Sequence, residues 1–215
     1  MTSSLDDASL RRAVRALVRR HGDLAGIHER HGCPPLWQRP AGFPTLLHII
    51  LEQQVSIASA RAAFDRLLVT AKPLTPRKFL ALDDAQLRAV GFSRQKADYA
   101  RGLAEAVIRR RLRLRRLVEL DDERVRDELT SIRGIGRWSA DIYLLMALGR
   151  PDVWPQGDLA LAQAMREVLG LDRRPTHEEQ LEISSRWQPW RAVAARLLWH
   201  HYLSTPRGLR ARTEY

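Results

Sequence analysis

Apolar residues recur every three or four positions along most of the chain, and this spacing is typical of amphipathic helices. The first such stripe is Leu10, Val14, Leu17 and Val18, which alternates with arginines. The same spacing predicts further helices over residues 45–54, 56–68, 94–110 and 137–148. Two short helices are expected to begin at Thr75 and Asp83, and others at Asp121, just after Asp158, at Thr176 and at Pro189. Strand-like alternation is confined to 112–115, which is short enough to be a connector. The pattern therefore predicts an all-α protein.

The expected helix ends rest on residues with well-defined capping chemistry. Pro44 and Pro189 suit the first turn of a helix, and Ser56 can accept a hydrogen bond from a first-turn amide. Gly91 and Gly149 suit left-handed helix ends. The spacing of Thr176-His-Glu-Glu179 predicts a capping box.

Two longer stretches, 21–43 and 150–157, lack a helical pattern and are expected to be irregular. The second leads directly into Asp158, and a long structured loop of this kind is often functional. An aspartate at the start of a helix is most often an N-cap, and the helix dipole favours its ionised form. An ionised carboxylate beside a sugar can also stabilise positive charge or activate a water. Both interpretations of Asp158 stay open at this point.

The glycines of Gly134-Ile135-Gly136 predict a tight hairpin between two short helices. Amide groups at the start of the second helix, near Arg137, would be free to bind a phosphate oxygen. Arg133 and Arg137 are expected to point charge outward, so the hairpin could hold a DNA backbone without reading bases. The alternative is an ordinary turn between packed helices.

Tryptophan is frequent, at positions 37, 138, 154, 187, 190 and 199. Core packing is the ordinary role of so large a side chain. Trp138, however, follows the hairpin by two residues, and a flipped base needs an aromatic wall in place of its lost stacking. Trp138 is therefore a candidate for the wall of a base pocket.

The composition is compatible with a protein that binds nucleic acid, although a basic surface can equally serve only to keep a protein soluble. The 215 residues carry a formal charge of +11, nearly all of the excess from arginine, which favours polyanions in a salt-dependent manner. The single cysteine, Cys33, excludes an internal disulfide and a four-cysteine zinc or iron–sulfur site. No phosphate-binding loop with Lys-Ser/Thr and no zinc-binding histidine signature is present, which disfavours nucleotide hydrolysis and zinc chemistry. No run of 18 apolar residues and no apolar signal core occur, so we expect neither membrane spanning nor secretion. The expected location is the cytoplasm, in association with the bacterial nucleoid and without contact with membranes.

Taken together, residues 129–145 and the downstream Asp158 resemble the signature of the DNA glycosylase (HhH-GPD) superfamily, a helix-hairpin-helix, a Gly/Pro-rich loop and an aspartate. Within it, Gly-Ile-Gly-Arg-Trp-Ser-Ala at 134–140 is similar to the AlkA-type alkylbase glycosylases, 3-methyladenine DNA glycosylase II. The stretches Ile50-Leu-Glu-Gln-Gln-Val-Ser56 and Arg186-Trp-Gln-Pro-Trp-Arg191 fit the same branch. The resemblance spans about residues 40–203 and is to a short form without an N-terminal β domain.

The resemblance implies one domain over 1–203, built from two interlocked helical subdomains with an active-site cleft between them. Subdomain one would cover about 45–145, and subdomain two about 1–44 plus 146–203. The basic stretch 204–215 is expected to be a mobile tail.

The resemblance also implies an activity. The enzyme would be a monofunctional glycosylase of base excision repair that flips alkylated purines, 3-methyladenine and 7-methylguanine, out of duplex DNA and hydrolyses the N-glycosidic bond. Asp158 matches the catalytic aspartate of the family. Trp138 stands where bifunctional relatives carry a Schiff-base lysine, so no lyase step is expected. We expect a monomer without a cofactor or iron–sulfur cluster, although a monovalent cation at the hairpin is compatible with the family.

By the same resemblance, Trp138, Tyr143 and either Trp187 or Trp190 would line the base pocket. Ile142 occupies the place where some relatives have a pocket aromatic, and Tyr143 points about 100° further round the helix. The DNA-binding residues would be Arg133, Gly134, Ile135, Gly136, Arg137 and Gln54. Gln54 stands at the position of the wedge that fills the gap left by the flipped nucleotide, and its alternative role is that of a surface amide at a helix end.

Two rival functions remain at this point. One is a non-catalytic helix-hairpin-helix module that recognises DNA structure. The other is a glycosylase for deaminated or oxidised bases.

Overall fold

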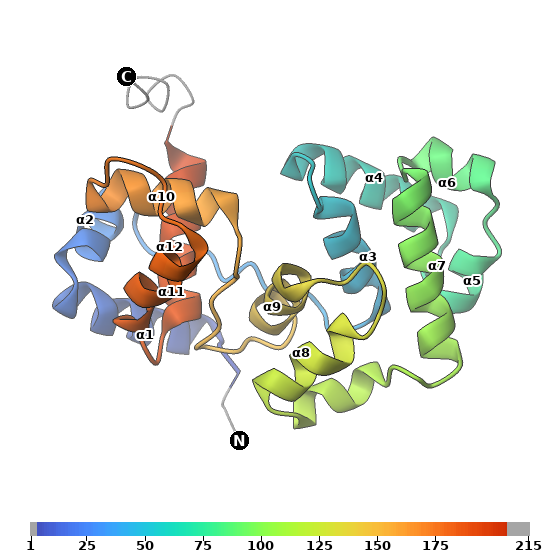
Figure 1. The fold of residues 1–215 in the computed structure, drawn as a ribbon, viewed down its shortest axis with the longest axis horizontal. Coiled ribbons are helices and arrows are strands. Elements are labelled where there is room, and N and C mark those ends of the chain that lie inside the picture. The colour runs from blue at the N-terminus through green and yellow to red at the C-terminus, as the bar shows by residue number, and fades with distance from the viewer. Residues whose placement is uncertain (1–3, 206–215) are drawn as a thin grey trace. The chain divides into compact units, whose positions relative to one another are not determined.

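The computed structural model describes residues 4–205, which form twelve α-helices, one 3₁₀-helix and no strand (Figure 1). The predicted all-α class is confirmed. The elements are α1 (Asp7–Arg20), α2 (Gly22–His31), α3 (Phe43–Glu52), α4 (Ile57–Thr70), α5 (Pro76–Leu80), α6 (Asp84–Val90), α7 (Arg94–Ile108), η1 (Leu114–Glu119), α8 (Asp122–Thr130), α9 (Arg137–Met146), α10 (Leu159–Leu169), α11 (His177–Ser185) and α12 (Arg191–Ser204). Apart from its first two residues, the expected basic tail lies outside the described residues. No helix among residues 4–205 is long and apolar enough to cross a membrane.

The helices belong to two compact units. One unit, residues 39–148, contains α3 to α9 and η1. The described part of the other unit, residues 4–38 and 149–205, contains α1, α2 and α10 to α12.

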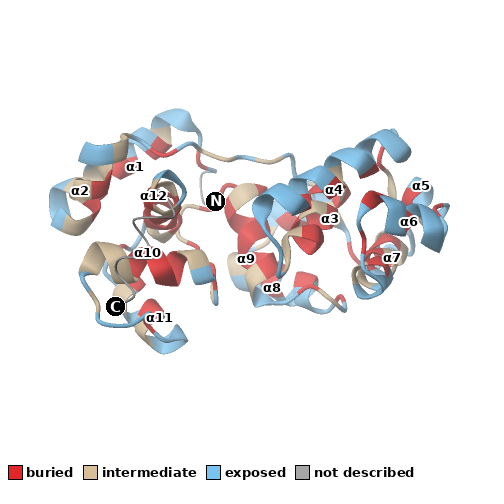
Figure 2. Cartoon of the chain, turned by 90° about the horizontal axis from the view of Figure 1, so that it is seen from above, coloured by how far each residue is buried: buried red, intermediate tan, exposed pale blue. Residues whose placement is uncertain are grey.

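The unit of residues 39–148 is built around α3. Seven of the ten residues of α3 are buried, and the helix packs against α4, α7 and α9. Figure 2 shows buried residues concentrated on α3, whereas α4 turns an exposed face outward. The start of the unit is tied to the end of α3, because both terminal nitrogens of Arg39 bind the Glu52 carboxylate at 2.9 and 2.6 Å.

The other unit is built around α12, which packs against α1, α2, α10 and α11. Nine of the fourteen residues of α12 are buried. One of them is Arg196, whose guanidinium donates to the Leu36 carbonyl at 2.9 Å and to the Ala192 carbonyl at 3.0 Å. Burial lowers the pKa of Arg196 to about 10. The contact with Leu36 anchors the chain before Gln38 to the central helix.

Several predicted helix ends are confirmed. The Ser56 hydroxyl accepts a hydrogen bond from the amide of Ser59, and Thr176 and Glu179 form a capping box. Gly91 has the left-handed conformation that was expected at the end of α6.

Two expectations are wrong. The stretch 21–43 is not irregular throughout, because α2 occupies Gly22–His31 and buries Leu24 and Ile27. Two buried apolar residues are too few to reveal a helix by periodicity. Pro189 does not open the last helix either: the Trp190 amide bonds the Trp187 carbonyl across it at 2.8 Å, so Pro189 lies in a turn and the helix begins at Arg191.

Candidate functional site

The predicted hairpin lies between α8 and α9, and Gly134 is required there by its surroundings. Its φ is +91°, and a Cβ at this position would overlap the Tyr99 side chain. Ile132 and Ile135 on either side are buried at 8% and 4% exposure, so they anchor the turn in the core. The backbone between them is therefore held tightly.

The surroundings of Gly136 are more open than those of Gly134. It is the N-cap of α9, makes no side-chain cap hydrogen bond, and a Cβ added to it would meet nothing within 4 Å. Packing among the described residues does not explain a glycine at this position. The open approach leaves the first turn of a ten-residue helix accessible to an anion, which the helix dipole favours.

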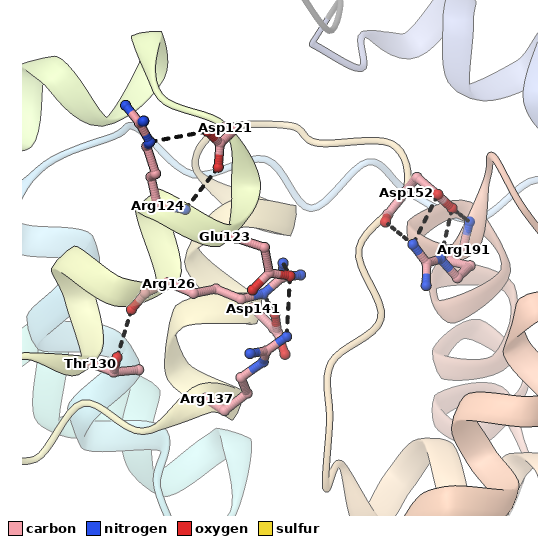
Figure 3. A network of polar contacts seen from close by, with 9 residues as sticks. All are labelled: Asp121, Glu123, Arg124, Arg126, Thr130, Arg137, Asp141, Asp152 and Arg191. Carbon is pink, nitrogen blue, oxygen red and sulfur yellow. Dashed lines mark hydrogen bonds and ion pairs between the residues drawn. The ribbon is translucent and has the colours of Figure 1, made fainter.

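A buried ion pair joins the two helices of the hairpin (Figure 3). The Arg126 guanidinium donates to the Asp141 carboxylate at 2.6 Å, and Asp141 is fully buried. The same guanidinium binds Glu123 at 2.7 Å, and Glu123 in turn lies 3.4 Å from Arg137. The pair sets α8 against α9 and thereby fixes the geometry of the turn between them.

The two hairpin arginines are exposed, as expected from the sequence, and each has a neighbour. The Arg133 guanidinium lies over the Tyr99 ring at 5.9 Å from its centroid. Arg137 makes the ion pair with Glu123, whose side chain is 66% exposed, so this contact is weak. Both guanidinium groups can therefore reach a phosphate at little cost.

A hollow of about 420 Å³ lies beside the hairpin in the same unit. Its lining residues come from the turn after α3, the first half of α7, the end of α8 and the hairpin turn: Gln53, Gln54, Gln95, Lys96, Tyr99, Thr130, Ile132, Arg133, Gly134, Ile135 and Gly136. The Lys96 ammonium donates to the Leu51 carbonyl at 2.7 Å, and partial burial lowers its pKa. The hollow thus combines backbone amides with positive charge.

Gln53 was not predicted, and it links the hairpin to the turn after α3. Its side-chain amide donates to the Gly134 carbonyl at 2.8 Å and to the Ser139 hydroxyl at 3.0 Å. The next residue, Gln54, is exposed and has a left-handed φ of +57°. Val55 and Ile57 beyond it are 46% and 63% exposed, so an apolar turn projects from the surface beside the hairpin hollow. This exposed position is compatible with both roles that were considered for Gln54, the wedge and a surface amide at a helix end.

Asp158 belongs to the other unit, where it is the N-cap of α10. Its Oδ1 accepts hydrogen bonds from the Leu161 amide at 2.9 Å and from the Trp199 indole at 3.3 Å. The residue is 9% exposed, so its carboxylate is held firmly in one position. Trp199 was not singled out by the sequence, because it stands in an apolar helix like any core residue.

The loop that leads to Asp158 is fastened to the start of α12 (Figure 3). The Arg191 guanidinium donates to the Asp152 carboxylate at 2.9 and 3.0 Å and to the Asp152 carbonyl at 3.1 Å. The Arg191 amide also donates to the same carboxylate at 3.1 Å. These bonds make an irregular loop a rigid support for the aspartate.

The four candidates for the base pocket differ in burial. Trp138 and Trp190 are half-buried, whereas Trp187 is fully buried and its ring lies 5.6 Å from that of Trp154. Tyr143 is fully buried as well, and its hydroxyl accepts a hydrogen bond from the Gly42 amide at 3.0 Å. Burial raises the pKa of Tyr143, and the Gly42 amide opposes this in part. Partial exposure favours Trp190 over Trp187 as a residue that could touch a base.

Comparisons with known proteins agree with these features. Residues 47–189 match the family described as HhH-GPD superfamily base excision DNA repair protein. The chain is 32% identical to DNA-3-methyladenine glycosylase 1 of Schizosaccharomyces pombe, over 73% of this chain and 71% of that protein. It is 29% identical to the putative DNA-3-methyladenine glycosylase YfjP of Bacillus subtilis, over 82% of this chain but only 64% of the relative's length.

The fold agrees with that of a solved relative. The structure of the S. pombe 3-methyladenine DNA glycosylase Mag1 in complex with abasic DNA superimposes with a TM-score of 0.78 at 27% identity, covering 87% of this chain and 95% of that one. The match covers both compact units described above, and the family match includes the hairpin and Asp158. The chain therefore belongs to the HhH-GPD superfamily of base excision DNA repair proteins.

Proposed function

We propose that this protein is a monofunctional DNA glycosylase that releases alkylated purines, 3-methyladenine and 7-methylguanine, from double-stranded DNA. The observation that carries the proposal is the carboxylate of Asp158, held by the Leu161 amide and the Trp199 indole at the end of a rigid loop. The names of the relatives, 3-methyladenine glycosylases, support the choice of substrate.

In this proposal the hairpin holds one DNA strand by its phosphates. The accessible amides at Gly136 and the start of α9 donate hydrogen bonds to a phosphate oxygen, and Arg133 and Arg137 neutralise neighbouring charge. Gln54, on the turn after α3, fills the space left by the flipped nucleotide. None of these contacts reads a base, which suits an enzyme that must search any sequence.

The proposed chemistry asks little of the enzyme because the substrate base is already positively charged. The bond between C1′ and the base nitrogen breaks, its electron pair leaves with the base, and the base becomes neutral. The Asp158 carboxylate stabilises the positive charge that grows on the deoxyribose, a fixed-charge effect worth on the order of 3–4 kcal/mol. Water then adds at C1′ and loses a proton, which gives an abasic site and a free purine.

The proposed reaction involves neither a lyase step nor a cofactor. Trp138 has no amine, so no Schiff base forms at that position and no strand cleavage follows. The reaction uses no iron–sulfur cluster or organic cofactor, and we propose that a monomer carries it out.

Incubation with methylated duplex DNA, followed by chromatography of the released bases, tests the proposal. We expect free 3-methyladenine and 7-methylguanine, and no covalent adduct with DNA on borohydride reduction. Salt-sensitive DNA binding without any released base would instead support a non-catalytic DNA-binding module. Preferential release of hypoxanthine, uracil or 8-oxoguanine from matched duplexes would support a glycosylase for deaminated or oxidised bases.

A further inference from the structure

A second hollow lies in the unit of residues 39–148, and most of its lining residues stand between α7 and α8 in the sequence. It has a volume of about 140 Å³, and four arginines contribute to its lining together with Leu117, Leu120 and Glu128: Arg110, Arg111, Arg113 and Arg116. We refer to these four residues as the arginine cluster. No residue of the cluster belongs to the lining of the hairpin hollow.

The segment around the cluster is strongly positive. Six arginines occur among the eight residues 109–116, and no carboxylate occurs between Glu105 and Glu119. Arg109 lies 3.8 Å from Glu105, and both side chains of this pair are well exposed. The other five arginines of the segment form no ion pair and no side-chain hydrogen bond with any residue between 4 and 205. Their charge is therefore available to a partner.

The backbone shows that an arginine is kept where another residue would fit better. Arg110 has a left-handed φ of +57° at the end of α7, where glycine is the usual residue. The amides of Arg111 and Leu112 both bond the Ala106 carbonyl, at 2.9 and 3.1 Å, which fixes the turn without the Arg110 side chain. Strained positions of this kind often mark functional sites.

The 3₁₀-helix η1 then sets the spacing of Arg113 and Arg116. Side chains three residues apart eclipse one another in a 3₁₀-helix, and the Arg116 amide bonds the Arg113 carbonyl at 2.9 Å. Arg113, the N-cap of η1, and Arg116 in its first turn therefore lie close together, about 6 Å apart along the helix axis. Leu112 and Leu117 are both 1% exposed and hold the segment in the core, which leaves the arginines on the surface.

We propose that the arginine cluster is a second phosphate-binding site for the DNA backbone, separate from the hairpin. The nine-residue helix α8, about 14 Å long, lies in the chain between the cluster and the hairpin. A single phosphate ion would not need four arginines, whereas successive backbone phosphates can each pair with a guanidinium group. The inference takes its DNA partner from the proposed function, but it does not depend on base release.

The test compares the salt dependence of binding to undamaged duplex DNA. In the first variant, Arg110→Gln, Arg113→Gln and Arg116→Gln are combined. The matched control combines Arg11→Gln, Arg15→Gln and Arg19→Gln on exposed positions of α1, which removes the same charge from the other unit. We expect the slope of log affinity against log salt to fall by about 2–3 in the cluster variant, roughly one for each lost contact, and to change little in the control.

A second variant separates binding from folding. Arg110→Gly relieves the left-handed strain, so it should raise the thermal unfolding midpoint while it weakens DNA binding, a combination that a purely structural arginine would not produce. Adding Arg133→Gln at the hairpin to the cluster variant should weaken binding by the product of the two separate effects, because the sites are independent.

Equal salt slopes in the cluster variant, the control and the unaltered protein would overturn the inference. A combined variant that binds no more weakly than Arg133→Gln alone would overturn it as well. Because the DNA is undamaged, a failure to release bases would refute the proposed function and leave this comparison valid.

Discussion

The hydrogen bond from Trp199 to Asp158 leads to a sharp prediction about base release. We expect Trp199→Phe to slow the release of 3-methyladenine from methylated duplex DNA under single-turnover conditions, with little change in DNA affinity. Trp199 is 8% exposed, and its indole donates a hydrogen bond to the Asp158 carboxylate, which also accepts one from the Leu161 amide. Phenylalanine keeps an aromatic ring at this place but has no donor, so the carboxylate becomes freer to move.

The magnitude follows from the geometry. Hydrogen bonds to charged groups contribute roughly 1.5–3 kcal/mol. The Trp199–Asp158 distance of 3.3 Å is slightly longer than the usual range, which favours the lower end of that interval. A loss of about 1.5 kcal/mol in the transition state corresponds to a rate about tenfold lower.

Trp154→Phe is the matched control, because it removes the same part of a buried ring. Trp154 is 3% exposed, and its indole nitrogen is buried without a hydrogen-bond partner among residues 4–205. The cavity left by the smaller ring should reduce the stability of both variants by a similar amount. Only the Trp199 variant should lose most of its rate of base release. Equal rates in the two variants would refute the positioning role of Trp199.

Two further predictions concern stability. Asp141→Asn leaves the buried Arg126 guanidinium with the exposed Glu123 as its remaining carboxylate, so urea unfolding should show a loss of up to about 3 kcal/mol. Arg126→Met combined with Asp141→Leu should recover most of this loss, and a double variant no more stable than the single one would contradict the prediction. Burial lowers the pKa of His201 in the folded protein, and Glu167 opposes this only in part. As the pH falls, the imidazole is therefore protonated in the unfolded chain before it is protonated in the folded one. The stability that neutral His201 contributes is lost as the pH falls below about 6.5. His201→Gln should therefore reduce the fall in the urea midpoint between about pH 7.5 and 5.5, and an unchanged or steeper fall would refute this.

Helical periodicity and capping residues were sufficient to predict the class of the fold. Ser56, Gly91 and Thr176 each end or begin a helix through local chemistry, and such local signals can be recognised in the sequence. The helix α2 was missed because only Leu24 and Ile27 face the core. The last helix was started too early, because Pro189 also suits a turn and the sequence does not distinguish the two.

The hairpin could be located from its two glycines, but their different roles could not. Gly134 is required by Tyr99, a residue 35 positions earlier, and this contact depends on the tertiary fold. Gly136 has no such neighbour, and its open surroundings are what favour a ligand there. The contact of Gln53 with the Gly134 carbonyl joins residues 81 positions apart and was equally hidden.

Asp158 could be singled out in the sequence, and its role as an N-cap is confirmed. Its catalytic role stays a prediction, as does the part of each tryptophan in a base pocket. The residue that fixes its carboxylate, Trp199, lies 41 positions further on in a helix buried on most sides, where periodicity gives no special signal. Side-chain contacts of this kind follow from packing and need coordinates.

The central claim is tested most directly by the rate of base release in Asp158→Asn, measured on methylated duplex DNA with the enzyme in excess. Asparagine is as good an N-cap as aspartate, and its Oδ1 can still accept from the Leu161 amide and the Trp199 indole. The substitution therefore removes the charge and leaves the fold and the hairpin intact. We predict that the rate of base release falls by a factor of several hundred or more, because about 3–4 kcal/mol of transition-state stabilisation is lost, while DNA affinity is retained. Release at an unchanged rate would contradict the account.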